Sequence, residues 1–230
     1  MWRTKRGSQR GFGSAARIFF AVAFGHLRLL HKAVNSIRGT GMTLPVWQPP
    51  VKNLPSETYL GERDKAALHQ AVGSALDEWE NLESALARLF GHMVESKSGA
   101  ALRAYGTIIS GRKEALEAAA IEFFRDKIPP DPTMADFFEL FTAYGSASQY
   151  RNNIAHGICY GRVYVRGKAP TTWFLYPPFY NTRRRKKSFR DEAAEYIYQA
   201  ADLARCEERF SQLSAAANGL EDYLRKIYPL

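Results

Sequence analysis

Residues 62–95 read ERDKAALHQAVGSALDEWENLESALARLFGHMVE, and this stretch decides the fold class. Its apolar side chains recur at steps of three and four residues, which draws a single apolar stripe along a helix. The stripe consists of Leu68, Val72, Leu76, Trp79, Leu82, Leu86, Leu89 and Met93. The intervening acidic side chains are expected on the solvent side, and these are Asp77, Glu78, Glu80 and Glu83. A helix with one apolar side needs other helices to cover it, so the pattern predicts a bundle.

Shorter stripes of the same kind predict three further helices downstream. The first covers about residues 99–109, and the second covers about 112–128, where Pro129-Pro130 removes the hydrogen bonds that would continue it. The third starts after Thr133, a residue type that caps helix N-termini, and runs to Gly157, a residue type that stops helices.

After Gly157 the periodicity changes from that of a helix to that of strands. Ile158–Arg166 and Thr172–Tyr176 alternate around a glycine–proline turn, which predicts a β-hairpin over about 158–178. A final long helix is expected to begin near Asp191. The sequence therefore predicts a mainly all-α fold, an antiparallel four- or five-helix bundle with an inserted β-hairpin before the last long helix.

Charge divides the chain into a basic N-terminal part and a nearly neutral remainder. Residues 1–41 hold eight of the 32 basic side chains and no acidic one, so residues 42–230 keep 24 basic and 23 acidic groups. We interpret residues 1–41 as a basic N-terminal extension, either sequence upstream of a true start at Met42 or a targeting segment. Prolines predict an irregular lead-in over 42–61, and the helical domain then spans 62–230.

The two cysteines, Cys159 and Cys206, lie far apart and in no metal-ligand spacing. They indicate a reducing compartment, and we expect a cytoplasmic protein in which both thiols are small apolar fillers. The apolar run over residues 15–25 is shorter than the roughly 20 residues that cross a bilayer, so no membrane association is expected. The histidines outside one motif have no ligand companions, and we therefore expect neither a metal nor a cofactor.

That motif is Tyr150-Arg151-Asn152-Asn153-Ile154-Ala155-His156-Gly157, at the end of the helix that begins after Thr133. Arg151 is a permanent, planar anion binder, and His156 can take and give a proton near neutral pH. With Asn152 they form a minimal set of groups for acting on a phosphodiester without a metal. On an ideal helix Arg151 points toward the apolar seam, about 140° from His156. Either the helix ends within the motif, or two copies combine across a dimer axis.

The same residues also allow a purely structural interpretation. Arg151 could pair with a buried carboxylate, Asn152 could cap a loop, and His156 could donate to a terminal carbonyl. A chance match in an unrelated helical protein is a further alternative, because arginine and histidine at this spacing are common.

Arg-Asn-x-x-Ala-His-Gly late in a helix resembles the signature of the HEPN superfamily, an arginine and a polar residue with a histidine shortly after. Arg151, Asn152 and His156 match that signature, and the resemblance covers roughly residues 60–228. It implies a four- or five-helix bundle that dimerises so that two motifs face one cleft. Active members are metal-independent endoribonucleases, often toxins or nucleic-acid defence factors, whereas other members have lost catalysis.

The resemblance therefore implies a HEPN-like, metal-independent endoribonuclease that acts as a dimer in a toxin, defence or stress role. Arg151, Asn152 and His156 would be its catalytic residues, and its products would carry 2′,3′-cyclic phosphates. The alternative is a catalytically inactive HEPN-like module that binds RNA, a nucleotide or a protein. Implied partners are RNA, a second copy of the chain and an antitoxin. The subgroup with a nucleotidyltransferase antitoxin has a tyrosine where this chain has Ile158.

A run of cations lies between the predicted hairpin and the last helix. Its members are Arg183, Arg184, Arg185, Lys186 and Lys187. Such a run can follow RNA phosphates, and the flanking Tyr180 and Phe189 could stack on bases. The run is accordingly a candidate RNA-binding segment, and its alternative is a solvated surface loop.

Overall fold

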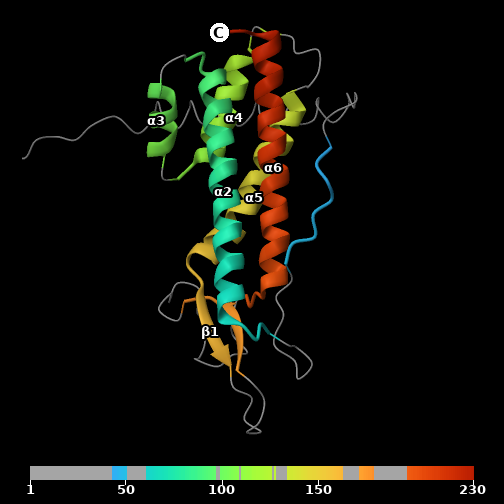
Figure 1. Cartoon of the computed structure of the whole chain (residues 1–230). Helices are drawn as coiled ribbons and strands as arrows, with labels where there is room; N and C mark the ends of the chain where they lie inside the picture. Colours follow the sequence, from blue (N-terminus) through green and yellow to red (C-terminus); the bar gives the residue numbers. More distant parts are fainter. Residues whose placement is uncertain are drawn as a thin grey trace, which may run out of the picture. The chain divides into compact units, whose positions relative to one another are not determined.

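The computed structural model describes residues 43–50, 61–96, 99–108, 110–125, 127, 134–162, 171–178 and 196–230, all within the unit Met42–Leu230. The elements in chain order are α2 (Lys65–Met93), α3 (Gly99–Thr107), α4 (Arg112–Phe123), α5 (Met134–Ala155), β1 (Ile158–Arg162), β2 (Thr172–Tyr176) and α6 (Ala200–Ile227) (Figure 1). The described part of the chain is thus mainly helical, with a two-stranded antiparallel hairpin before the last helix. This confirms the predicted fold class.

The described helices alternate in direction along the chain, so α2 and α6 run parallel. Contacts between α2 and α6 follow the same order along both helices: Trp79–Phe210, Arg88–Glu221 and His92–Tyr228. Contacts between α2 and α5 follow opposite orders: Glu83–Tyr144 and Glu80–Arg151. The long helices α2 and α6 lie side by side, α5 packs against both of them, and α4 packs against α2 and α5 (Figure 1).

The predicted apolar stripe of α2 forms the centre of the core. Six of its eight members are buried: Leu68, Trp79, Leu82, Leu86, Leu89 and Met93. They pack against apolar faces of α5 and α6, including Phe137, Leu140, Phe141, Phe210, Leu213 and Leu224. Each such side chain removed from water stabilises the fold by about 1.5–3 kcal/mol, which is why periodicity alone predicted the bundle.

One buried carboxylate, Glu83, joins four helices. Tyr105 of α3 and Tyr144 of α5 each donate a phenolic hydrogen bond to it, at 3.3 and 2.9 Å. The Nη1 atom of Arg112, from α4, lies 2.9 Å from its Oε2 atom. Since only 8% of Glu83 is exposed, these three partners replace the water that its charge would otherwise need.

The solvent-facing position predicted for Glu83 is therefore wrong. The prediction used only the periodicity of α2, and the partners that compensate this charge come from α3, α4 and α5. Burial, and after it the nearby Glu83 carboxylate, raises the pKa of Tyr105 and of Tyr144 above that of an ordinary phenol. Both side chains consequently stay protonated and act as donors.

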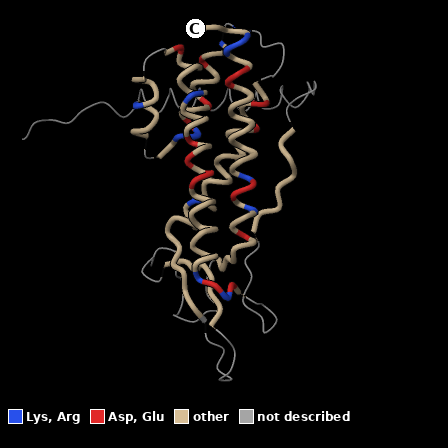
Figure 2. The backbone as a smooth tube through the Cα atoms, in the orientation of Figure 1, with Lys and Arg blue, Asp and Glu red and all other residues tan. Residues whose placement is uncertain are grey.

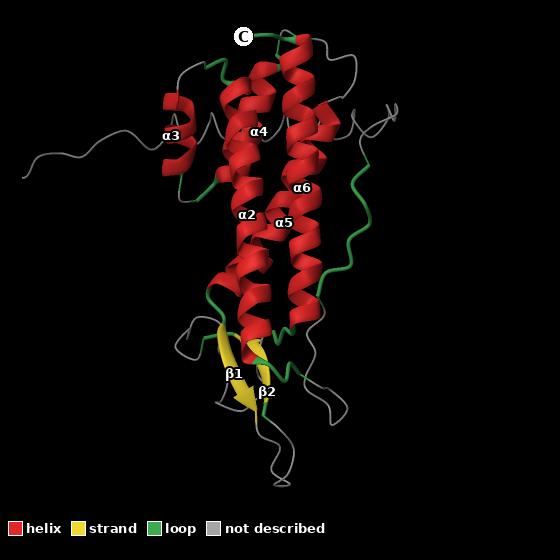
Figure 3. Cartoon of the chain, in the orientation of Figure 1, coloured by secondary structure: helices red, strands yellow, loops and turns green. Residues whose placement is uncertain are grey.

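The hairpin lies at the end of the bundle where α2 and α6 begin (Figure 3). Its register runs from Ile158 opposite Tyr176 to Arg162 opposite Thr172. Strand β2 also pairs outside the hairpin, at Glu62–Trp173 and Leu175–Tyr198, in two isolated antiparallel bridges. The segments that precede α2 and α6 are therefore fastened to the same strand.

The second of these bridges explains why α6 begins later than predicted. Tyr198 exchanges two backbone hydrogen bonds with Leu175, of 2.8 and 3.0 Å, which holds it extended. Gln199 then caps α6 in a capping box with Asp202, so the helix begins at Ala200 and not near Asp191. The other helices follow their predictions to within a few residues, although α4 ends at Phe123. Thr133 and the predicted helix stop Pro129-Pro130 lie outside the described residues.

The described part of the proline-containing lead-in, residues 43–50, has no regular secondary structure, as predicted. It nevertheless packs on α5 and α6. The Pro45 carbonyl accepts a 3.0 Å hydrogen bond from Arg209 Nη1, and the Trp47 ring meets the Tyr150 ring edge-on at 4.8 Å between centroids. This packing brings the lead-in next to the motif in α5. No helix among the described residues is both long and apolar enough to cross a bilayer.

Candidate functional site

The motif covers the last six residues of α5 and the two residues that follow it, and the hairpin packs against the end of that helix. Ile154 is 1% exposed and anchors the turn in the core. A Cβ atom at Gly157 would lie 2.6 Å from Leu175 Cγ and 2.9 Å from the Asn153 carbonyl oxygen, closer than real Cβ contacts allow. Glycine therefore lets the chain leave α5 and enter β1 close to the Leu175 side chain of β2.

Two tyrosines from the segment before α6 hold the same turn. Tyr196 donates a 2.8 Å hydrogen bond to the Asn153 carbonyl, and the Asn153 side chain donates one of 3.1 Å to the Tyr198 hydroxyl. The two rings stack with centroids 4.9 Å apart, and burial raises the pKa of Tyr198 to about 12. The motif gave no indication of this role, because Asn153 falls at one of its variable positions. The available signal was the strand-like alternation at 196–198.

Arg151 is partly exposed and only loosely paired. One third of its side chain, 33%, is exposed, and its Nη2 atom lies 3.8 Å from Glu80 Oε1. Because the Glu80 side chain is itself 69% exposed, this contact is not the buried ion pair of the structural interpretation. Arg151 Nη1 donates to Asn152 Oδ1 at 3.3 Å, and its buried Nε atom has no hydrogen-bond partner among the described residues.

His156 follows the last residue of α5 and is exposed. Its backbone N–H donates to the Asn152 carbonyl at 3.1 Å, which completes the helix. Within the described part of the chain, its imidazole makes no hydrogen bond or ion pair, so it does not donate to a terminal carbonyl as the structural interpretation supposed. The ring is accessible to a ligand from solvent.

The structure thus brings together two of the three predicted catalytic residues within one chain. Arg151 donates a hydrogen bond to Asn152, whereas the His156 imidazole makes no hydrogen bond to either of their side chains. The charged neighbour that α2 contributes to Arg151 is the acidic Glu80, and acidic positions recur along the middle of that helix (Figure 2). The candidate RNA-binding cations, Arg183, Arg184, Arg185, Lys186 and Lys187, lie outside the described residues.

Neither cysteine belongs to this site. Cys206 is buried in the core, where burial raises its pKa to about 12, and the half-buried Cys159 has a raised pKa for the same reason. A raised pKa keeps a thiol protonated and unreactive at neutral pH. Among the described residues, no three histidine, cysteine, aspartate or glutamate side chains converge as a metal site would require.

Comparison with models of known families, with curated proteins and with solved structures gives no match for this chain. Fold and site together define its class as a helical bundle with a β-hairpin at one end and an Arg-Asn-x-x-Ala-His-Gly motif where α5 ends. The relation to HEPN proteins stays a prediction based on that motif and the surrounding helices.

Proposed function

We propose that this protein is a HEPN-like, metal-independent endoribonuclease that works as a homodimer in the cytoplasm, in a toxin, defence or stress role. The observation that carries the proposal is the accessibility of the motif: His156 is exposed, and Arg151 keeps a third of its side chain in solvent. A histidine buried against its own subunit would have favoured a structural role instead.

In the proposed reaction, a neutral His156 takes the proton of a ribose 2′-hydroxyl. The freed oxygen attacks the adjacent phosphorus, the bond from phosphorus to the 5′-oxygen breaks, and a protonated His156 of the second copy gives that oxygen a proton. Arg151 holds the phosphate through two N–H donors and offsets the charge that accumulates on it. Asn152 orients a phosphate oxygen or the imidazole. The products are a 2′,3′-cyclic phosphate and a 5′-hydroxyl.

Glu80 must release Arg151 before a phosphate can bind, so the free energy of this ion pair has to be smaller than that of phosphate binding. Exposed ion pairs contribute only about 0–1 kcal/mol, because water screens both charges. A contact of 3.8 Å to a carboxylate that is 69% exposed belongs in this range. An incoming phosphate with two charge-assisted hydrogen bonds gains more than that, so it can displace Glu80.

The test is cleavage of single-stranded RNA by the full chain in excess chelator. Wild-type protein should cleave and leave 2′,3′-cyclic ends, whereas His156→Ala should lose about 10²-fold to 10⁴-fold in rate, the usual contribution of a general acid or base. His69→Ala is the matched control, because His69 is an exposed histidine on α2 outside the motif. Cleavage that needs a divalent metal, or full cleavage by His156→Ala, would refute the proposed metal-independent mechanism.

The acidic neighbour of Arg151 on α2, Glu80, favours a second candidate, a catalytically inactive HEPN-like binding module. Under this alternative, RNA, a nucleotide or an antitoxin-like protein binds at the motif without reaction. Wild-type protein would then leave RNA intact and still bind it, and Arg151→Gln would weaken that binding. In either case the run Arg183–Lys187 is proposed to follow RNA phosphates, so its replacement by glutamine should lower the salt dependence of binding.

A further inference from the structure

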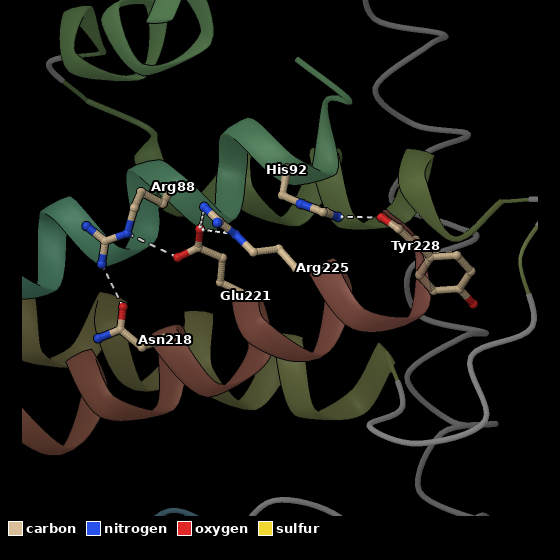
Figure 4. Close-up of polar contacts among 6 residues, drawn as sticks. All are labelled: Arg88, His92, Asn218, Glu221, Arg225 and Tyr228. Atoms are coloured by element: carbon tan, nitrogen blue, oxygen red, sulfur yellow. Dashed lines mark hydrogen bonds and ion pairs between the residues drawn. The ribbon is translucent and has the colours of Figure 1, made fainter. Parts of the chain in front are cut away.

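A cavity of about 550 Å³ lies far along α2 from the motif, where α2 and α6 end and α3 begins. Its volume falls in the range of small-molecule sites, about 300–1,000 Å³. Arg88 and His92 of α2 line it together with Glu221 and Arg225 of α6 (Figure 4). The remaining lining includes the apolar side chains of Leu102, Pro229 and Leu230.

Two arginines hold one carboxylate in the wall of this cavity. Arg88 Nε lies 3.1 Å from Glu221 Oε2, and its Nη2 donates to Asn218 Oδ1 at 2.7 Å. Arg225 donates to Glu221 Oε1 from both Nε and Nη2, at 2.9 and 2.6 Å (Figure 4). The Glu221 side chain is 6% exposed, so both guanidinium groups are fixed on a rigid anchor.

This arrangement carries more positive charge than Glu221 needs. Two other buried carboxylates, Glu83 and Asp202, are each paired with a single arginine. At Glu221 the second arginine leaves a net charge of +1 on the three side chains. The Arg88 and Arg225 side chains are 43% and 63% exposed, and Nη1 of each makes no hydrogen bond to any described residue. Donors and surplus charge therefore remain for an anion.

His92 lines the cavity as an uncharged side chain, so it adds no charge to those of Arg88, Arg225 and Glu221. Burial lowers the pKa of His92, so the ring is neutral at pH 7. Its Nε2 atom lies 3.0 Å from the Tyr228 carbonyl oxygen, which can only accept, so Nε2 carries the proton. Lys127, the other cation that affects this ring, is 2.6 Å from Glu95 and is already paired.

We propose that this cavity binds a small organic phosphate, with the phosphate on Arg88 and Arg225 and the organic part against Leu102, Pro229 and Leu230. A guanidinium recognises a phosphate through paired N–H donors and keeps its charge at every physiological pH. The volume of the cavity exceeds that of an inorganic phosphate, and a bare phosphate ion would leave the apolar lining without a contact. A ligand with an apolar group attached to its phosphate fits both parts.

The test is isothermal titration calorimetry of the full chain with phenyl phosphate, inorganic phosphate and benzoate. Phenyl phosphate should bind more tightly than either, because only it has both the dianion and the apolar group. Arg225→Gln should weaken its binding about tenfold or more, the usual loss for hydrogen bonds to charged groups. Arg205→Gln is the matched control. The Arg205 side chain is 43% exposed, pairs with the buried Asp202 on α6 and lies outside the cavity.

Arg88→Gln provides the second variant and should show the same loss, with Arg225 still neutralising Glu221. Thermal melting of each variant separates loss of binding from loss of fold. Undetectable binding of phenyl phosphate at millimolar concentration would overturn the proposal. So would equal affinity for inorganic phosphate, or an equal loss in Arg205→Gln. Because neither Arg151 nor His156 lines the cavity, the rate of RNA cleavage by Arg225→Gln should equal that of the wild type.

Discussion

Two arginine–glutamate contacts lie three residues apart on α2, and they differ in almost every physical respect. Arg112 lies 2.9 Å from Glu83, whose side chain is 10% exposed, and two phenols complete the hydrogen bonding of that carboxylate. Arg151 lies 3.8 Å from Glu80, whose side chain is 69% exposed. Glu83 and its three partners join four helices, whereas the second contact joins two partly or largely exposed side chains.

The difference shows that an ion pair by itself does not reveal what an arginine does. A buried carboxylate that loses its partners is left with an uncompensated charge, so the Glu83 contact cannot open without loss of stability. An exposed carboxylate that loses its partner is solvated by water at once, so the Glu80 contact can open at low cost. Arg112 is therefore part of the scaffold, whereas Arg151 remains available to a ligand.

The largest expected effect is that of Glu83→Ala. It leaves the Tyr105 and Tyr144 hydroxyls without their acceptor and Arg112 without its partner, so we expect a loss of about 3 kcal/mol in the free energy of unfolding. Urea denaturation at pH 7 measures it. Glu80→Ala is the control, and equal losses in the two variants would remove the distinction between the contacts.

A smaller effect is expected from alkaline pH. The pKa values of Tyr105 and Tyr144 are raised by burial and then by Glu83, so the folded protein keeps protons that the unfolded chain releases above pH 10. Stability is therefore full below pH 10 and falls above it, by about 1.4 kcal/mol per pH unit for each phenol. Urea denaturation between pH 9 and 11 gives this slope. Tyr144→Phe should make the slope shallower, and an unchanged slope would contradict this origin.

The smallest expected effect on stability is that of Glu80→Gln. Removing the charge from an exposed partner should change the free energy of unfolding by less than about 0.5 kcal/mol. The same substitution should strengthen RNA binding, because it frees Arg151 and removes a negative charge beside it. Fluorescence anisotropy with labelled RNA at low and high salt measures this. Weaker binding in Glu80→Gln would show that Glu80 positions Arg151 and does not compete for it.

Local patterns were sufficient for the scaffold of the molecule. The stripe from Leu68 to Met93 predicted α2 because 3.6-residue periodicity places these side chains on one side of any helix. Alternation predicted the hairpin that β1 and β2 form, and Gly157 was correctly expected just after the end of α5. The start of α6 was predicted wrongly, because the Leu175–Tyr198 pairing that holds its preceding segment extended is a contact between distant residues.

The sequence by itself determined the helical class, the hairpin and the position of Arg151, Asn152 and His156 at a helix end, because each depends on short-range periodicity and residue chemistry. Only the tertiary structure decided that Glu83 is buried and Glu80 is not, that Asn153 is tied to two tyrosines, and that Arg88 and Arg225 share Glu221. The physical reason is the same in each case. The energy of a charged or polar side chain depends on partners that the sequence places tens of residues away, and only folding brings them within hydrogen-bonding distance.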